Sequence, residues 1–103
     1  MKALVSSLAL LNGIKEAINA GLSSLEIEKQ AIHLYCSNGS IVVINLHIYK
    51  DFEHIVLDKV DQLQWRRMAD FLISIPEQPI VIEINQYEDD KISIEFSQFI
   101  ARF

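Results

Sequence analysis

The sequence predicts an α+β domain with a mainly antiparallel sheet of about five strands and two helices, in the order α-β-β-β-α-β-β. Two segments repeat apolar residues at the three- and four-residue spacing of an amphipathic helix, and most of the others alternate apolar and polar residues as strands do. Short polar turns join consecutive strands, which favours antiparallel pairing. With 103 residues, half of them apolar, the chain is expected to form a single domain over residues 1–103.

The first helix is predicted over residues 3–20. Its apolar positions recur at helical spacing: Leu4, Leu8, Leu11, Ile14 and Ile18. Gly21 follows as a C-terminal stop. Gly13 in the middle of this helix marks either close packing or a break, and the sequence leaves both alternatives open.

A first hairpin is predicted after this helix, because the apolar period changes to two from Leu25 onward. Asn38-Gly39 is a strong signal for a two-residue type I′ turn, which needs positive φ at both positions. Such a turn pairs Tyr35 with Val42 and His33 with Ile44. The core face of the hairpin is then expected to carry these residues: Leu25, Ile27, Ala31, His33, Tyr35, Val42, Ile44, Leu46 and Ile48.

The opposite face of the same hairpin is expected to be polar at one end and apolar near the turn. Either the second helix or the C-terminal segment covers this apolar end, or a second copy of the chain or a peptide does. The residues of this candidate dimer or peptide surface are Ile32, Leu34, Ile41, Val43, Phe99 and Phe103.

A third strand is expected in "EHIVL", followed by the second helix from Val60 to Ile75. Asp61 stands at the N-cap position, and Trp65 falls on the apolar stripe. Arg66 is four residues from Asp70, which favours an ion pair on the helix surface. The neighbouring Arg67 points about 100° away from Arg66, so this helix does not predict a shared phosphate site.

The last hairpin carries the candidate partner-binding residues: Glu83, Glu88, Asp89, Asp90 and Glu95. Strict alternation places Ile84 opposite Ile94 and Glu83 opposite Glu95, which requires an odd-length loop. This negative surface would accept Arg and Lys side chains from a partner, although its charges also suit a solvated hairpin protected from aggregation. The final "SQFIARF" is expected either to prolong the last strand or to form a short helical turn.

The net charge, the single cysteine and the absence of known motifs exclude several kinds of partner and site. The formal net charge of −5 argues against nucleic acid as a partner, and the single Cys36 excludes an internal disulfide. His47 and His54 are cross-strand neighbours for one loop length but lack a third ligand at metal-site spacing, so no metal and no cofactor are expected. Without a nucleotide-binding or hydrolase motif, the chain is not expected to be an enzyme. With no membrane span or signal peptide expected, a soluble cytoplasmic protein is predicted.

The function predicted from these features is that of a small acidic protein-binding module, an inhibitor of immunity or anti-defence type that docks on a basic partner surface. The first alternative is a homodimeric chaperone or adaptor that holds an unfolded segment. The order of elements is similar to that of small acidic homodimeric chaperones of bacterial secretion systems, whose last helix has little room in the seven residues after Phe96. The second alternative is a single-stranded nucleic-acid binder that stacks bases on Trp65 beside Arg66 and Arg67. Its strand-rich segment before a Trp-bearing helix resembles that of dimeric single-stranded DNA-binding coactivators.

Overall fold

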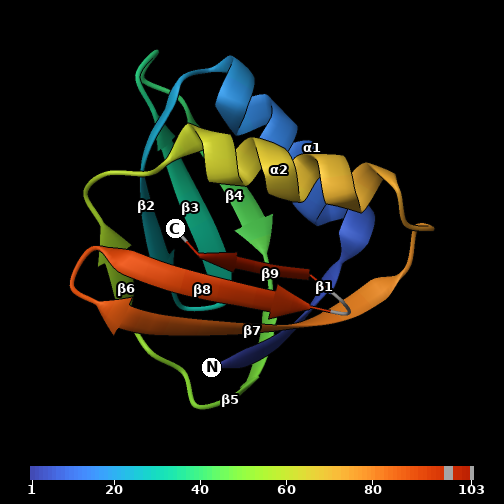
Figure 1. Cartoon of the computed structure of the whole chain (residues 1–103). Helices are drawn as coiled ribbons and strands as arrows, with labels where there is room; N and C mark the ends of the chain where they lie inside the picture. The colour runs from blue at the N-terminus through green and yellow to red at the C-terminus, as the bar shows by residue number, and fades with distance from the viewer. Residues whose placement is uncertain (97–98, 103) are drawn as a thin grey trace.

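Two helices and two antiparallel sheets surround one apolar core in the computed structural model, which describes residues 1–96 and the backbone of residues 99–102 (Figure 1). The elements are β1 (Lys2–Ser6), α1 (Ser7–Asn19), β2 (Leu22–Glu28), β3 (Ala31–Cys36), β4 (Ile41–Asn45), β5 (His47–Lys50), β6 (Ile55–Leu57), α2 (Gln62–Ile73), β7 (Pro79–Glu88), β8 (Lys91–Phe96) and β9 (Phe99–Arg102). The α+β class, the two helices and the antiparallel pairing are confirmed. The predicted order is wrong, because the chain runs β-α-β-β-β-β-β-α-β-β before β9.

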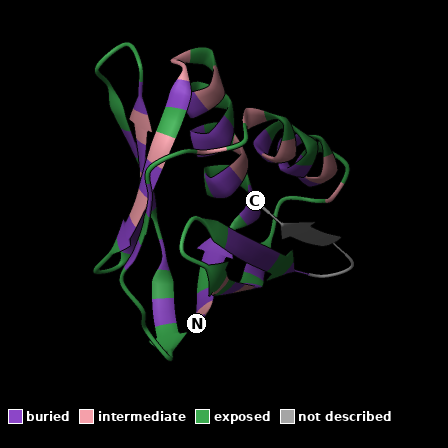
Figure 2. Ribbon diagram, turned by 60° about the vertical axis from the view of Figure 1, so that its left-hand side comes forward, coloured by how far each residue is buried: buried purple, intermediate pink, exposed green. Residues whose placement is uncertain are grey.

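The strands form two sheets instead of the single predicted sheet. One has the order β4-β3-β2-β6, and the other has the order β5-β1-β7-β8 with β9 beside β8. The chain passes from one sheet to the other at Leu46, because β5 pairs with β1 and does not prolong β4. The helices lie side by side, and α1 packs on the inner face of the four-stranded sheet (Figure 2).

Residues 2–6 are a strand and not the first turn of a helix. Ala3 and Val5 point into the core, and β1 pairs with both β5 and β7. The helix starts after Ser6, whose hydroxyl accepts a hydrogen bond from the backbone N–H of Ala9 at 3.3 Å. The predicted stop is confirmed, since Gly21 follows the helix with φ of +84°.

The turn between β3 and β4 has three residues, which shifts the predicted register by one. The N–H of Cys36 donates to the carbonyl of Ser40, and among the turn residues only Gly39 has a positive φ, of +89°. This is the three-residue loop with a left-handed glycine, and not the type I′ turn. Tyr35 therefore pairs with Ile41.

The predicted long strand is also broken at Lys29, which has φ of +55°, so that β2 folds back on β3. Together the two turns bring these side chains to the buried face: Leu25, Ile27, Ile32, Leu34, Val42 and Ile44. The prediction that His33 and Tyr35 share the core face is wrong, because they lie on the outer face, where both are half-buried. The predicted pairing of Ile44 with His33 is replaced by its pairing with Ile32.

The second half of the chain follows its prediction more closely. The carboxylate of Asp61 caps α2 by accepting from the N–H of Leu63 at 3.0 Å, and Trp65 is fully buried on the inner stripe. Arg66 and Asp70, expected to pair, form no ion pair, although the structure describes both residues. The strand β6 pairs with β2, which was not predicted.

The pairings of Glu83 with Glu95 and of Ile84 with Ile94 are confirmed. The predicted odd-length loop is wrong: the turn has two residues, and the odd residue count comes from a bulge at Tyr87. After β8 the chain turns back as β9, so neither alternative for the end of the chain is correct. Among the described residues, no helix is long and apolar enough to cross a bilayer.

Candidate functional site

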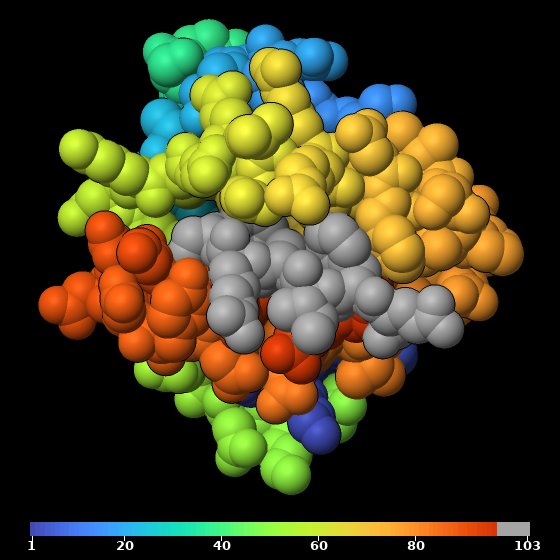
Figure 3. Space-filling model, in the orientation of Figure 1, coloured from blue at the N-terminus to red at the C-terminus, as the bar shows by residue number. Residues whose placement is uncertain are grey.

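The turn between β7 and β8 gathers carboxylates at one end of the sheet. We call Glu88, Asp89 and Asp90 the acidic tip; all three are exposed. In Figure 3 the β7–β8 end of the molecule protrudes at the left edge, in orange to orange-red. The turn is held by the side-chain amide of Gln86, which donates to the carbonyl of Asp89 at 2.8 Å. The acidic tip therefore projects from the fold on a turn that this hydrogen bond closes.

A hollow of about 280 Å³ adjoins the acidic tip, and its lining is partly aromatic. Glu53, from the segment between β5 and β6, lines it together with Gln86, Tyr87, Glu88 and Asp89. The bulge leaves the Tyr87 side chain about half exposed. The hollow thus combines a phenol ring with carboxylates from two separate segments of the chain.

Lys91 partly balances the acidic tip. Its Nζ atom lies 3.4 Å from Oε2 of Glu88, and the hydrogen bond with this carboxylate, followed by its charge, raises the pKa of Lys91 above the usual value of 10.5. Both side chains are about half exposed, so the pair is screened and contributes little to stability. Asp89, Asp90 and Glu53 form no ion pair within the part of the chain that the structure describes.

Glu83 and Glu95 lie farther along the hairpin than the acidic tip. They face each other, as the sequence predicts, but β1 places Lys2 opposite Glu83 on its other side. Glu83 and Glu88 are five residue steps apart along β7, about 16 Å. The structure therefore does not bring all five predicted partner-binding residues to one point, and the strongest uncompensated charge is at the acidic tip.

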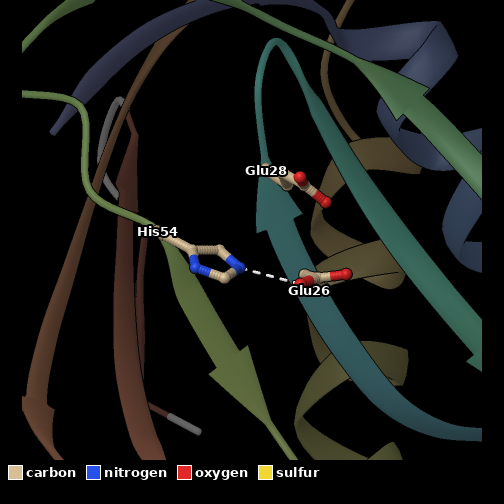
Figure 4. A group of neighbouring side chains, drawn as sticks. All are labelled: Glu26, Glu28 and His54. Atoms are coloured by element: carbon tan, nitrogen blue, oxygen red, sulfur yellow. Dashed lines mark hydrogen bonds and ion pairs between the residues drawn. The ribbon is translucent and has the colours of Figure 1, made fainter.

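A second group of polar side chains lies on the outer face of β4-β3-β2-β6, which we call the open face. Glu26 is at its centre: Nε2 of His54 lies 2.7 Å from Oε2 of Glu26 (Figure 4). The hydroxyl of Tyr35 donates to Oε1 of Glu26 at 3.1 Å. The hydrogen bond with His54, followed by that from Tyr35, lowers the pKa of Glu26 below its usual value near 4.5. Glu28 lies beside this pair on β2, and one ligand atom of each of the three side chains lies within 4.8 Å of the other two.

The predicted dimer or peptide surface is divided by the register shift. Ile32 and Leu34 are fully buried in the core, so their assignment to this surface is wrong. Ile41 and Val43 do lie on the open face, where they are 55% and 50% exposed. The side chains of Phe99 and Phe103, the remaining two members, lie outside the described residues.

The predicted base-stacking platform, Trp65, is not available at the surface. Trp65 is 0% exposed, so it has no accessible ring face for a nucleotide base. Arg66 and Arg67 are exposed. The prediction that bases stack on Trp65 is therefore wrong.

Several residues of these sites escaped the sequence prediction. Glu53 and Tyr87 join the acidic tip through the fold of the β5–β6 segment and through the bulge. Glu26 and His54 meet because β6 pairs with β2, whereas the sequence suggested only His47 as a neighbour of His54. The sequence offered one signal for the bulge, which was the odd number of residues between the paired positions of β7 and β8. This number fits either an odd-length loop or a bulge, since both keep the apolar side chains of the two strands on the same face.

Comparisons of the chain with protein-family models, with curated proteins and with solved structures find no match.

Proposed function

We propose that the protein is a small acidic protein-binding module that docks its acidic tip on a basic surface of a partner protein. One observation carries the proposal: Glu53, Glu88 and Asp89 line the hollow beside the tip together with the half-exposed Tyr87. Carboxylates and an aromatic ring suit an Arg or Lys side chain, through charge-assisted hydrogen bonds and a cation–π contact. Tyrosine is also among the residues enriched at interface hot spots.

The proposed activity is inhibition of the immunity or anti-defence type, in a cytoplasmic setting. A partner that handles nucleic acid presents clustered Arg and Lys to phosphates, and the carboxylates of the acidic tip would occupy the same cations. The net charge of −5 supports this direction, because long-range attraction speeds encounter with a basic surface. The buried, unpaired Cys36 is compatible with a reducing compartment.

The test uses the partner recovered from the native host by pull-down and purified. The association rate with this partner is measured over a range of salt concentrations for the wild type and for the triple variant Glu88→Lys/Asp89→Lys/Asp90→Lys. The variant is expected to associate at least tenfold more slowly, with a flatter salt dependence, because the steering charge is reversed. A second variant, Tyr87→Ala, is expected to raise the dissociation rate instead.

The matched control is Glu16→Lys/Asp70→Lys/Glu77→Lys, which changes the net charge by the same amount at exposed residues of other surfaces. If both triple variants slow association equally, only the net charge matters and the acidic tip is not the docking site. Unchanged association of the acidic-tip variant would also reject the proposal.

A second candidate function, a homodimeric chaperone or adaptor, is favoured by the apolar part of the open face. Ile41, Val43 and Val56 are each about half exposed there, on strands β4 and β6. Light scattering checks this candidate: a dimer that dissociates in the variant Val43→Asp supports it, and a strict monomer that binds no unfolded peptide rejects it.

A further inference from the structure

Three potential metal ligands converge on the open face: Glu26 and Glu28 of β2, and His54 just before β6 (Figure 4). One ligand atom from each, a carboxylate oxygen or an imidazole nitrogen, lies within 4.8 Å of the other two. We propose that these three side chains bind a single Zn²⁺ ion. The site is separate from the acidic tip and does not depend on the proposed docking function.

The backbone holds these ligands in place. β2 and β6 are paired in register at Glu26–Val56 and Ile27–Ile55, which sets position 54 beside Glu28. Residues 26 and 28 share one side of β2, because successive side chains on a strand point to opposite faces. Ile27 and Ile55 are both fully buried on the other side, so the two strands are anchored in the core beneath the cluster. Ligands on such rigid elements need little rearrangement to bind an ion.

The donor set favours zinc over the common hard cations. Zn²⁺ takes imidazole nitrogen and carboxylate oxygen at about 2.0–2.2 Å, whereas Ca²⁺ and Mg²⁺ prefer oxygen ligands alone. Nε2 of His54 and Oε2 of Glu26 are 2.7 Å apart. Two ligands of a tetrahedral Zn²⁺ ion lie roughly 3.3 Å apart, so the ion replaces this hydrogen bond with a small movement of the two side chains.

Tyr35 supplies the orienting contact that metal-binding carboxylates usually have. Its hydroxyl donates to Oε1 of Glu26 at 3.1 Å, which leaves Oε2 directed at His54. Tyr35 comes from β3, the strand on the other side of β2 from β6. The site is therefore defined by β2, β3 and the residue that precedes β6, and Tyr35 acts in it as a positioning residue.

Zinc at this site ties the segment between β5 and β6 to the sheet, because His54 is the last residue before β6. The same segment contributes Glu53 to the hollow beside the acidic tip. Binding to the folded state alone also raises the melting temperature of the chain.

Isothermal titration of the full chain with zinc sulfate tests the proposal, with magnesium and calcium salts for comparison. We expect one Zn²⁺ per chain and no saturable binding of Mg²⁺ or Ca²⁺. His54→Gln, Glu26→Gln and Glu28→Gln are each expected to weaken zinc binding by at least about tenfold, and Tyr35→Phe by up to about tenfold. His47→Gln is the matched control, because His47 lies on β5 in the other sheet, and it is expected to leave the affinity unchanged.

A second measurement uses the wild-type chain, so the result does not depend on whether a variant folds. In the NMR spectrum, zinc is expected to shift the imidazole resonances of His54 before those of His33 and His47. The proposal is wrong if zinc does not bind stoichiometrically, if His54→Gln binds it as tightly as the wild type, or if the shifts appear at His47 alone. A chain that binds no zinc would leave the Glu26–His54 contact as a hydrogen bond without a metal role.

Discussion

Ile44 of β4 occupies the space that a side chain on Gly13 of α1 would need. A Cβ atom at position 13 would lie 2.7 Å from Cδ1 of Ile44, and closer still to its Cγ1. Both residues are buried where α1 packs on β4. Of the two alternatives that the sequence leaves open for Gly13, the structure therefore supports close packing, since the helix continues unbroken through this position.

The variant Gly13→Ala tests this contact. Alanine raises helix propensity by about 1 kcal/mol, but overpacking of a core costs about 1–3 kcal/mol. We expect a net loss in the free energy of unfolding, measured by urea denaturation. The double variant Gly13→Ala/Ile44→Ala is expected to lose less than the sum of the two single losses, because removing the Ile44 branch relieves the clash. A stabilised Gly13→Ala variant would contradict the close packing.

The three-residue turn between β3 and β4 predicts a specific cost at Gly39. No atom lies within 4 Å of a Cβ at this position, so the effect of Gly39→Ala comes from its φ of +89° alone. We expect a loss of about 1–2 kcal/mol, and a smaller one for Gly39→Asn. Asn38→Gly distinguishes the two turn types: a type I′ turn would gain from glycine, whereas here the Asn38 side chain accepts from the N–H of Ser40 at 2.9 Å and its loss destabilises. If Asn38→Gly stabilises the chain, the result would contradict the three-residue turn and support the two-residue type I′ turn.

The register shift separates Leu34 from Val43, which the sequence placed on one outer face. Leu34 is fully buried and Val43 is half exposed. Leu34→Ala is expected to lower the free energy of unfolding by about 2–5 kcal/mol, and Val43→Ala by less than about 1 kcal/mol. Chemical denaturation of the two variants under the same conditions checks the difference. Equal losses would mean that the two side chains share one environment.

Glu26 predicts a pH dependence on the acidic side. Its pKa in the folded chain lies below the usual value near 4.5, so its contribution to stability is fully present above the unfolded-state pKa and is lost as the pH falls through the folded-state pKa. We expect Glu26→Gln to be less stable than the wild type above about pH 5, with a difference that shrinks as the solution is made more acidic. Urea unfolding from pH 3 to pH 7 measures it. His54→Gln should also weaken the dependence of stability on pH, because the hydrogen bond with His54 is the largest cause of the lowered pKa of Glu26. If the wild type, Glu26→Gln and His54→Gln give parallel curves of stability against pH, Glu26 does not have this role.

Local patterns were sufficient for α2 and for the β7–β8 hairpin. The cap at Asp61 and the buried position of Trp65 depend on residues within a few positions of each other, and so does the pairing of Glu83 with Glu95. These features are properties of short stretches, which is why the sequence alone predicts them. The bulge at Tyr87 was not predicted, because an odd-length loop would account for the same mismatch in residue count.

The division into two sheets was not predictable in the same way. Val5 belongs to a short stretch of alternating apolar and polar residues that continues directly into a helical pattern. This stretch is a strand because it pairs with β5 and β7, which are distant along the chain. Pairing of β6 with β2 likewise depends on which edge is free once β2 and β3 have folded together. It is this pairing that brings His54 to Glu26.

Composition and short-range spacing are sufficient to predict the α+β class, the two helices, the acidic character and the carboxylates of the acidic tip. Which faces are buried and which residues meet depends on contacts between segments that are distant along the chain. The three-residue turn at Gly39 moves the β3–β4 register by one residue, and together with the turn at Lys29 it exchanges the two faces of β3. That choice is settled by the free energy of burying Leu34 and Ile32 in the common core, which no local pattern records.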